Sequence, residues 1–162
     1  VQPQYLGFTE GAEALLEGQV DALWVFAGFP NTSVTKIASQ TKIKLLPVYK
    51  EAEENSELFE DYPFYAKVVI PANTYEGVDY DVVTYQDSTL LTANKRVSSK
   101  DIDKLLQVIY EPESLEYLVS LKSTAKDMNL ESGLTGIVTP LHRGAKNFWQ
   151  NKGKILTPEQ IQ

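Results

Sequence analysis

The 162-residue sequence contains no cysteine, a single histidine and a single methionine. Without thiols the chain cannot form a disulfide framework, a cysteine-based zinc site or a cysteine nucleophile. Its net charge of −7 comes from dispersed acidic residues, which argues against nucleic acid and anionic membranes as partners, because both require clustered lysine and arginine. No apolar run approaches the ~18 residues of a membrane span, and nothing at the N-terminus resembles a signal peptide. The composition is that of a globular protein of one or two compact units.

Sequence patterns of nucleotide binding and of serine hydrolysis are also missing. The chain has neither the dinucleotide glycine pattern nor a P-loop, and no serine stands in a Gly-x-Ser-x-Gly elbow. His142 is the one candidate general base, and without a partner nucleophile a helix-capping or loop-joining role is favoured. The acids Glu76, Asp79 and Asp81 lack EF-hand spacing and indicate a solvated loop. We therefore expect no enzyme activity, no metal and no cofactor.

The first 71 residues alternate between helical and strand-like patterns. In chain order they predict a helix (9–17), a buried strand (20–27), a helix beginning at Pro30, a strand (43–49), an acidic helix ended by Pro63, and a strand (64–71). The order βαβαβ over residues 20–70, with connections long enough to hold helices, is typical of a largely parallel sheet. The predicted fold class is therefore α/β.

The remaining residues are predicted to be mainly helical. The expected elements are a strand (84–94), a helix (99–111), a helix beginning at Pro112, a helical turn with a loop (129–144), a last helix (144–153) and a loosely held tail (154–162). The helix over 99–111 has the clearest start, because Ser98 and Asp101 approximate a capping box. Gly153 is expected to end the last helix.

Gly28, Phe29 and Pro30 stand where the predicted buried strand ends and a helix begins. In open α/β sheets ligands bind at this edge, and N–H groups at a helix start favour a carboxylate or phosphate. Gly28 allows close approach to the backbone, and Phe29 could cover the apolar part of a ligand. A tight strand-to-helix turn with a core phenylalanine explains the same pattern, so both interpretations stay open here.

Four aromatic residues gather around two prolines: Tyr62, Phe64, Tyr65 and Tyr75. Aromatic rings near a backbone crossing can wall a pocket or can cover the end of a sheet. The pattern alone does not separate a pocket from a core.

Three segments, taken in order, resemble the solute-binding receptors of the TAXI branch of tripartite ATP-independent periplasmic (TRAP) transporters. They are YLGFTEGAEALLEGQVDALWVFAGFP, YPFYAKVVIPANTYEG and PLHRGAKNFWQNKG. Two positions depart from the family pattern: Phe29 stands where a small residue is usual, and Asn73 where glycine is common. Both departures could reshape a pocket and change the ligand preference.

The resemblance implies a type II periplasmic-binding-protein fold with a mostly parallel sheet and flanking helices, of which only part is present. Residues 1–64 are expected to finish the second lobe, and residues 65–162 to form the crossover and the C-terminal part of the first. The implied partners are a small ligand, the TRAP permease subunits and a missing N-terminal half, and the implied location is periplasmic or extracellular on a membrane anchor. The expected ligand-binding residues are Phe26, Gly28, Phe29, Pro30, Asn31, Tyr65 and Tyr75.

The resemblance also implies a non-enzymatic function. The expected role is that of a receptor that binds a small organic anion or an amino acid similar to glutamate in an interlobe cleft. Two alternatives stay open: a structural fragment that binds no ligand alone and associates with another chain, and a hydrolase that uses His142 as its base.

Overall fold

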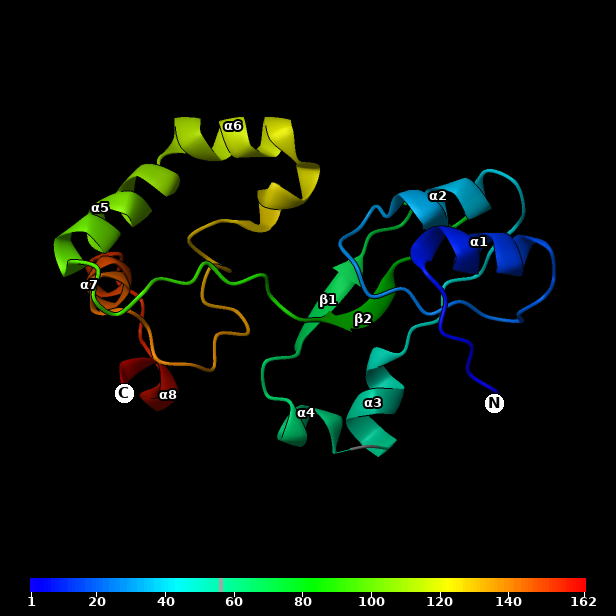
Figure 1. Ribbon diagram of the computed structural model, residues 1–162, viewed down its shortest axis with the longest axis horizontal. Coiled ribbons are helices and arrows are strands. Elements are labelled where there is room, and N and C mark those ends of the chain that lie inside the picture. The colour runs from blue at the N-terminus through cyan, green and yellow to red at the C-terminus, as the bar shows by residue number, and fades with distance from the viewer. Residues whose placement is uncertain (56) are drawn as a thin grey trace. The chain divides into compact units, whose positions relative to one another are not determined.

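The structure is a computed structural model that describes residues 1–55 and 57–162 (Figure 1). The described chain divides into two compact units, which are treated separately below. Unit 1 comprises Val1–Glu51 and Lys67–Tyr85, and unit 2 comprises Ala52–Ala66 and Gln86–Gln162. The division at residue 64 that the resemblance implies concerns the lobes of a longer receptor and stays a prediction.

Unit 1 begins with two helices that pack on each other, α1 (Phe8–Leu16) and α2 (Thr32–Ala38). The helix predicted over 9–17 is confirmed as α1, which buries its alanines because they lie on one face. The chain leaves α1 through Gly18, whose φ of +70° favours glycine. The helix predicted from Pro30 is also confirmed, although α2 begins two residues later, after Asn31 as its N-cap.

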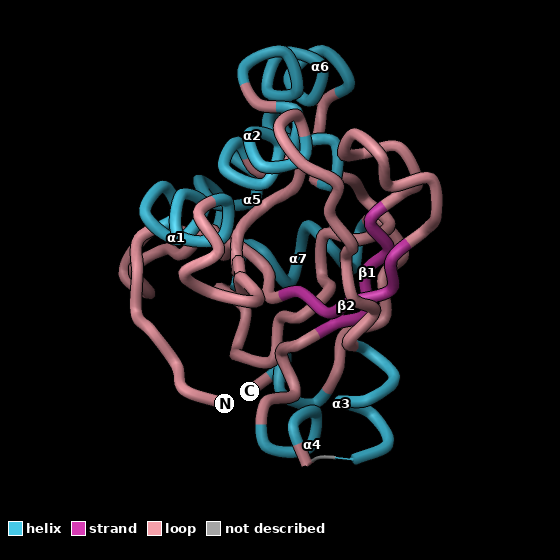
Figure 2. Tube along the Cα trace, turned by 90° about the vertical axis from the view of Figure 1, so that its right-hand side faces the viewer, coloured by secondary structure: helices cyan, strands magenta, loops and turns pink. Residues whose placement is uncertain are grey.

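The strands predicted at 20–27 and 43–49 are wrong. Neither segment adopts a strand, and the side chains of Trp24 and Leu46 are 64% and 61% exposed. The consecutive apolar residues were interpreted as a strand buried on both faces, but burial of that kind requires neighbouring strands on either side. Within residues 1–55 and 57–162 the sheet consists of β1 (Ala66–Ile70) and β2 (Val82–Gln86), which pair antiparallel (Figure 2). The protein is thus mixed α/β with a small antiparallel sheet, and the expected mostly parallel sheet is not observed.

The strand predicted at 64–71 is confirmed as β1, whereas β2 begins and ends earlier than the predicted 84–94 strand. The reason is burial, since Val82 is 2% exposed and belongs to the core of unit 1. This core consists of Ala38, Tyr75, Val78 and Val82, with Phe29, Val34, Ile43, Leu45 and Ile70 packed against it.

The acidic segment between the strand-like regions is helical, as predicted, in the residues that the structure describes. It forms α3 (Tyr49–Asn55) and α4 (Leu58–Asp61), and Pro63 follows α4 closely. Because proline disfavours helix in the residue before it, the position of Pro63 accounts for the end of this segment.

Unit 2 is mainly helical. The helices predicted over 99–111, from Pro112 and over 144–153 are confirmed as α5 (Ser99–Ile109), α6 (Pro112–Leu121) and α7 (Arg143–Asn151). The 3-10 helix η1 (Ser123–Asp127) and the helix α8 (Pro158–Ile161) were not predicted. The Ser98 side chain accepts a hydrogen bond from the Asp101 N–H at 3.1 Å and so caps α5. Helices α5 and α7 approach closely at Gly144, where a Cβ atom would lie 2.9 Å from the Cβ of Ile102.

The prediction of a loosely held tail is wrong. Leu156 joins the core of unit 2, and the Gln160 side chain is 3% exposed. Its amide donates to the Ile137 carbonyl oxygen at 2.8 Å, while its backbone oxygen accepts from the Leu141 N–H at 3.0 Å. A glutamine that enters a core through hydrogen bonds leaves no apolar pattern, so periodicity alone does not predict its burial. Within the described part of the chain, no helix has the length and apolar character needed to cross a membrane.

Candidate functional site

The segment before α2 is fixed by a tyrosine that lies 44 residues further along the chain. The Asn31 N–H donates to the Tyr75 hydroxyl oxygen at 2.9 Å. The Asn31 side chain, in turn, accepts from the N–H groups of Ser33 and Val34 at 3.0 and 3.2 Å. Asn31 therefore connects the core tyrosine to the first turn of α2.

These bonds change the interpretation of the helix start as an anion site. Two of the N–H groups that were expected to hold an anion, those of Ser33 and Val34, are already bonded to Asn31. Among the described residues, the N–H groups of Gly28 and Thr32 donate to no other residue. The donors that remain for an anionic ligand in this segment therefore lie on Gly28 and Thr32 rather than deeper in the helix.

The predicted site residues of unit 1 differ in their exposure. Phe26 is 43% exposed, and Gly28 and Pro30 are exposed as well. Phe29, however, is half-buried and packs against the core cluster that contains Tyr75. Phe29 is therefore the core phenylalanine of a tight turn, and the exposed side of the segment is formed by Phe26, Gly28 and Pro30. The peptide bond between Phe29 and Pro30 is cis.

Tyr75 lies in the core and not on an open surface. Its side chain is 5% exposed, and burial raises the pKa of its hydroxyl, an effect that the bond from the Asn31 backbone partly opposes. The neutral hydroxyl acts as the acceptor that holds Asn31 in place. Its role in the site is therefore to position the segment.

Tyr65, the remaining predicted site residue, belongs to unit 2. Its ring contacts those of Phe64 and Tyr62, with centroid separations of 4.7 and 6.1 Å. The structure thus brings Phe29, Asn31 and Tyr75 together in one unit, while Tyr65 stands in an aromatic cluster of the other.

Sequence reasoning missed two further tyrosines of unit 1, one that bonds a distant backbone through its hydroxyl and one that contacts a distant ring. The Tyr80 hydroxyl accepts from the Leu45 N–H at 3.0 Å and donates to the Leu45 oxygen at 3.1 Å. The Tyr85 ring contacts that of Trp24, with centroids 6.3 Å apart. No local sequence signal marks them, because both contacts join residues that are distant in the sequence.

His142 has the structural role that the sequence favours. It is the N-cap of α7, and its Nδ1 accepts a hydrogen bond from the Gly144 N–H at 3.1 Å. In the acidic loop, Asp81 accepts from the Ala72 N–H at 2.8 Å. No cluster of three or more potential metal ligands occurs in residues 1–55 and 57–162.

Comparison with known protein families places the chain among the periplasmic solute-binding proteins. The profile of the NMT1-like family matches residues 1–153, and the chain belongs to this family. Membership confirms the resemblance to periplasmic solute-binding proteins as a class. It is consistent with an extracytoplasmic solute-binding role. Proteins of this kind are typically periplasmic or extracellular, and the family suggests a periplasmic-binding-protein fold.

Proposed function

We propose that this chain is part of a non-enzymatic extracytoplasmic receptor of the TAXI type, which delivers a small organic anion or an amino acid similar to glutamate to a TRAP membrane permease. The observation that carries the proposal is the family match over residues 1–153. The arrangement of the residues before α2 supports it, since they form an exposed segment on a fixed backbone.

The three tyrosines of unit 1 explain how such a segment can be rigid without being part of a sheet. Tyr75 holds Asn31, Tyr80 holds Leu45, and Tyr85 contacts Trp24. A backbone fixed in this way loses little further conformational entropy when a ligand binds, which favours affinity. The Gly28 and Thr32 N–H groups then provide donors for a carboxylate, and the Phe26 ring provides apolar contact.

The finer features of the receptor are part of the same proposal. Phe26, Gly28 and Pro30 would face the ligand, while Phe29, Asn31 and Tyr75 would support them from the core of unit 1.

A thermal-denaturation screen with L-glutamate, L-aspartate and succinate tests this function. A ligand present at 100 times its dissociation constant adds about 2.7 kcal/mol to the free energy of unfolding, which is enough for a clear shift of the melting temperature. Phe26→Ala should reduce the shift. Leu46→Ala is the matched control, because Leu46 is also an exposed apolar residue of unit 1 but lies outside the proposed site. Equal loss in both variants, or no shift with any probe, would count against the receptor.

One observation favours a second candidate function, association with another chain. Trp24 and Leu46 expose large apolar side chains, and exposed apolar surface of this kind often marks an interaction site. Sedimentation of the 162-residue chain separates the candidates, since the receptor proposal expects a monomer that responds to ligand. A stable oligomer without any ligand response would favour association.

A further inference from the structure

Positive charge gathers at one place in unit 2, around the first turns of α5 and α7. The side chains that define this basic surface are Lys95, Arg96, Lys100, Lys104 and Arg143. They are five of the 15 lysines and arginines of the chain, and all five are exposed. All belong to unit 2, so the basic surface is complete within one compact unit.

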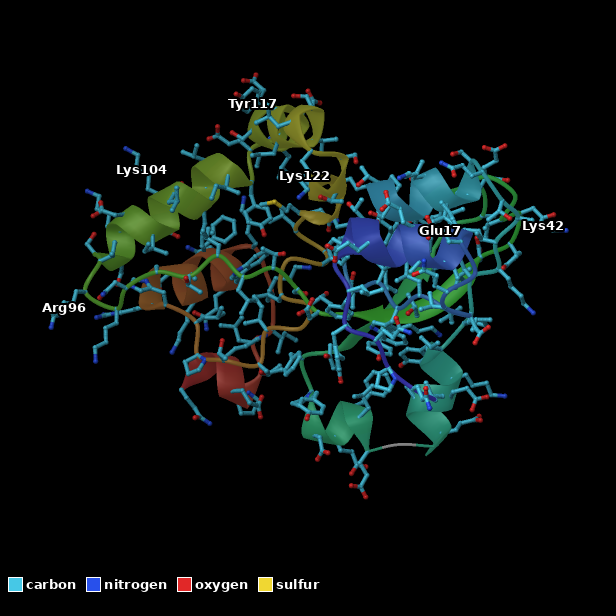
Figure 3. The ribbon with its side chains drawn as sticks, turned by 45° about the vertical axis from the view of Figure 1, so that its right-hand side comes forward. Glu17, Lys42, Arg96, Lys104, Tyr117 and Lys122 are labelled. Atoms are coloured by element: carbon cyan, nitrogen blue, oxygen red, sulfur yellow. The ribbon has the colours of Figure 1, made fainter. Side chains whose placement is uncertain are left out.

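Four of these cations follow one another closely along the chain. Lys95 and Arg96 are consecutive and stand just before Ser98, the N-cap of α5. Lys100 and Lys104 are four residues apart in α5, so they project from the same face of the helix. Figure 3 shows the side chains of Arg96 and Lys104 pointing outward from unit 2.

Arg143 joins these cations through the packing of α7 on α5. A Cβ atom at Gly144 would lie 2.9 Å from the Cβ of Ile102, so the start of α7 lies against the first turn of α5. Arg143 directly precedes Gly144, and α7 contains no acidic residue. The charge of Arg143 therefore adds to that of the α5 cations and is not cancelled within its own helix.

The protein leaves the five cations without ion-pair partners. Among the described residues, no side chain of the basic surface forms an ion pair or a hydrogen bond. The acids in the same helix are Asp101 and Asp103, and the Asp103 carboxylate accepts from the Gln107 amide at 2.7 Å. Five cations beside two acids leave a positive surface on a chain whose net charge is −7.

We propose that the basic surface binds an acidic segment of a partner protein. Carboxylates of the segment pair with the lysines, and with Arg96 and Arg143 through two parallel hydrogen bonds each. An anionic membrane or a nucleic acid suits this surface less, because such an extended polyanion repels the net charge of −7 that the whole chain carries. The basic surface belongs to unit 2 and the segment before α2 to unit 1, so either proposal can fail without the other.

Fluorescence anisotropy of a labelled hexaglutamate peptide, titrated with the 162-residue chain, tests the basic surface. Chain and peptide both carry net negative charge, so binding has to come from a local positive surface. We expect saturable binding that weakens at least tenfold between low and physiological salt, because exposed ion pairs are screened. No binding at millimolar concentration in low salt would overturn the proposal, as would binding to phosphatidylserine vesicles without binding to the peptide.

Charge-removing variants locate the binding. Arg96→Gln, Lys100→Gln and Arg143→Gln together should raise the dissociation constant of the peptide at least tenfold, whereas Asp101→Asn should lower it. All of these side chains are exposed, so the variants retain the fold. Lys122→Gln is the matched control, because Lys122 is also an exposed lysine of unit 2 but lies at the end of α6, away from Arg96 (Figure 3). A triple variant that binds as tightly as the unchanged chain, or a control that loses as much affinity as Lys100→Gln alone, would overturn the assignment.

Discussion

Replacing Tyr75 with phenylalanine tests whether a single buried hydroxyl fixes the segment before α2. The substitution keeps the ring in the core and removes only the acceptor that lies 2.9 Å from the Asn31 N–H. Because Tyr75 is 5% exposed, water cannot readily replace its hydroxyl, and the Asn31 N–H loses its partner. The expected cost is about 1–2 kcal/mol in the free energy of unfolding, from the lost bond and the unsatisfied donor. Urea denaturation followed by circular dichroism measures this cost.

Tyr80→Phe is the matched control for this experiment. The Tyr80 hydroxyl makes two hydrogen bonds to Leu45, one more than Tyr75 makes to Asn31, but its side chain is 37% exposed. Water can replace exposed bonds, so we expect a cost of about 0.5 kcal/mol or less. If the control variant loses as much stability as Tyr75→Phe, burial does not determine the effect and the reasoning is refuted.

Further predictions concern unit 2 and the pH dependence of stability. Gly144→Ala should lower the free energy of unfolding by more than about 2 kcal/mol, because the added Cβ would collide with α5. Gly153→Ala should lower it by about 1 kcal/mol, because Gly153 has a φ of +77° but open space around it. Urea denaturation measures both. Gln160→Ala should cost about 1–3 kcal/mol, since it removes a buried side chain and leaves the partly buried Ile137 carbonyl oxygen without its donor. Native-state hydrogen exchange should then speed up in the tail, and an unchanged rate would contradict the docking of the tail. Burial raises the pKa values of Tyr75 and Tyr110 above 10.0, so the folded state retains these protons at higher pH than the unfolded state does. The stability should therefore be constant as the pH approaches 10 and should fall as the pH rises further, and Tyr110→Phe should make that fall less steep.

Most of the helices, together with the strand β1, could be predicted from the sequence. Helices α5, α6 and α7 have local signals, namely the Ser98 cap, Pro112 in the first turn and Gly153 after the last one. Such signals act within a few residues, so they predict a helix boundary without knowledge of tertiary contacts. The strands at 20–27 and 43–49 could not be decided in this way, because a strand depends on partners distant in the sequence.

The candidate site was predictable only in part for a related reason. The glycine and proline of the 28–30 segment marked a turn, and the turn is present. The Tyr75 hydroxyl accepts a hydrogen bond from Asn31, which lies 44 residues away in the sequence. Asn31 in turn occupies two N–H groups of α2. Composition and spacing do not determine such contacts, which is why a residue expected to wall a pocket is found in the core.

The central claim, that the segment before α2 binds an anionic solute, is tested most directly by nuclear magnetic resonance. Amide resonances of the ¹⁵N-labelled chain would be followed during a titration with L-glutamate. The account predicts saturable shifts that are largest at Gly28 and Thr32, whose N–H groups donate to no other described residue, and small shifts at Ser33 and Val34. Saturable binding that shifts other amides and leaves the 26–32 segment unchanged would contradict it, as would the absence of any shift with glutamate, aspartate and succinate.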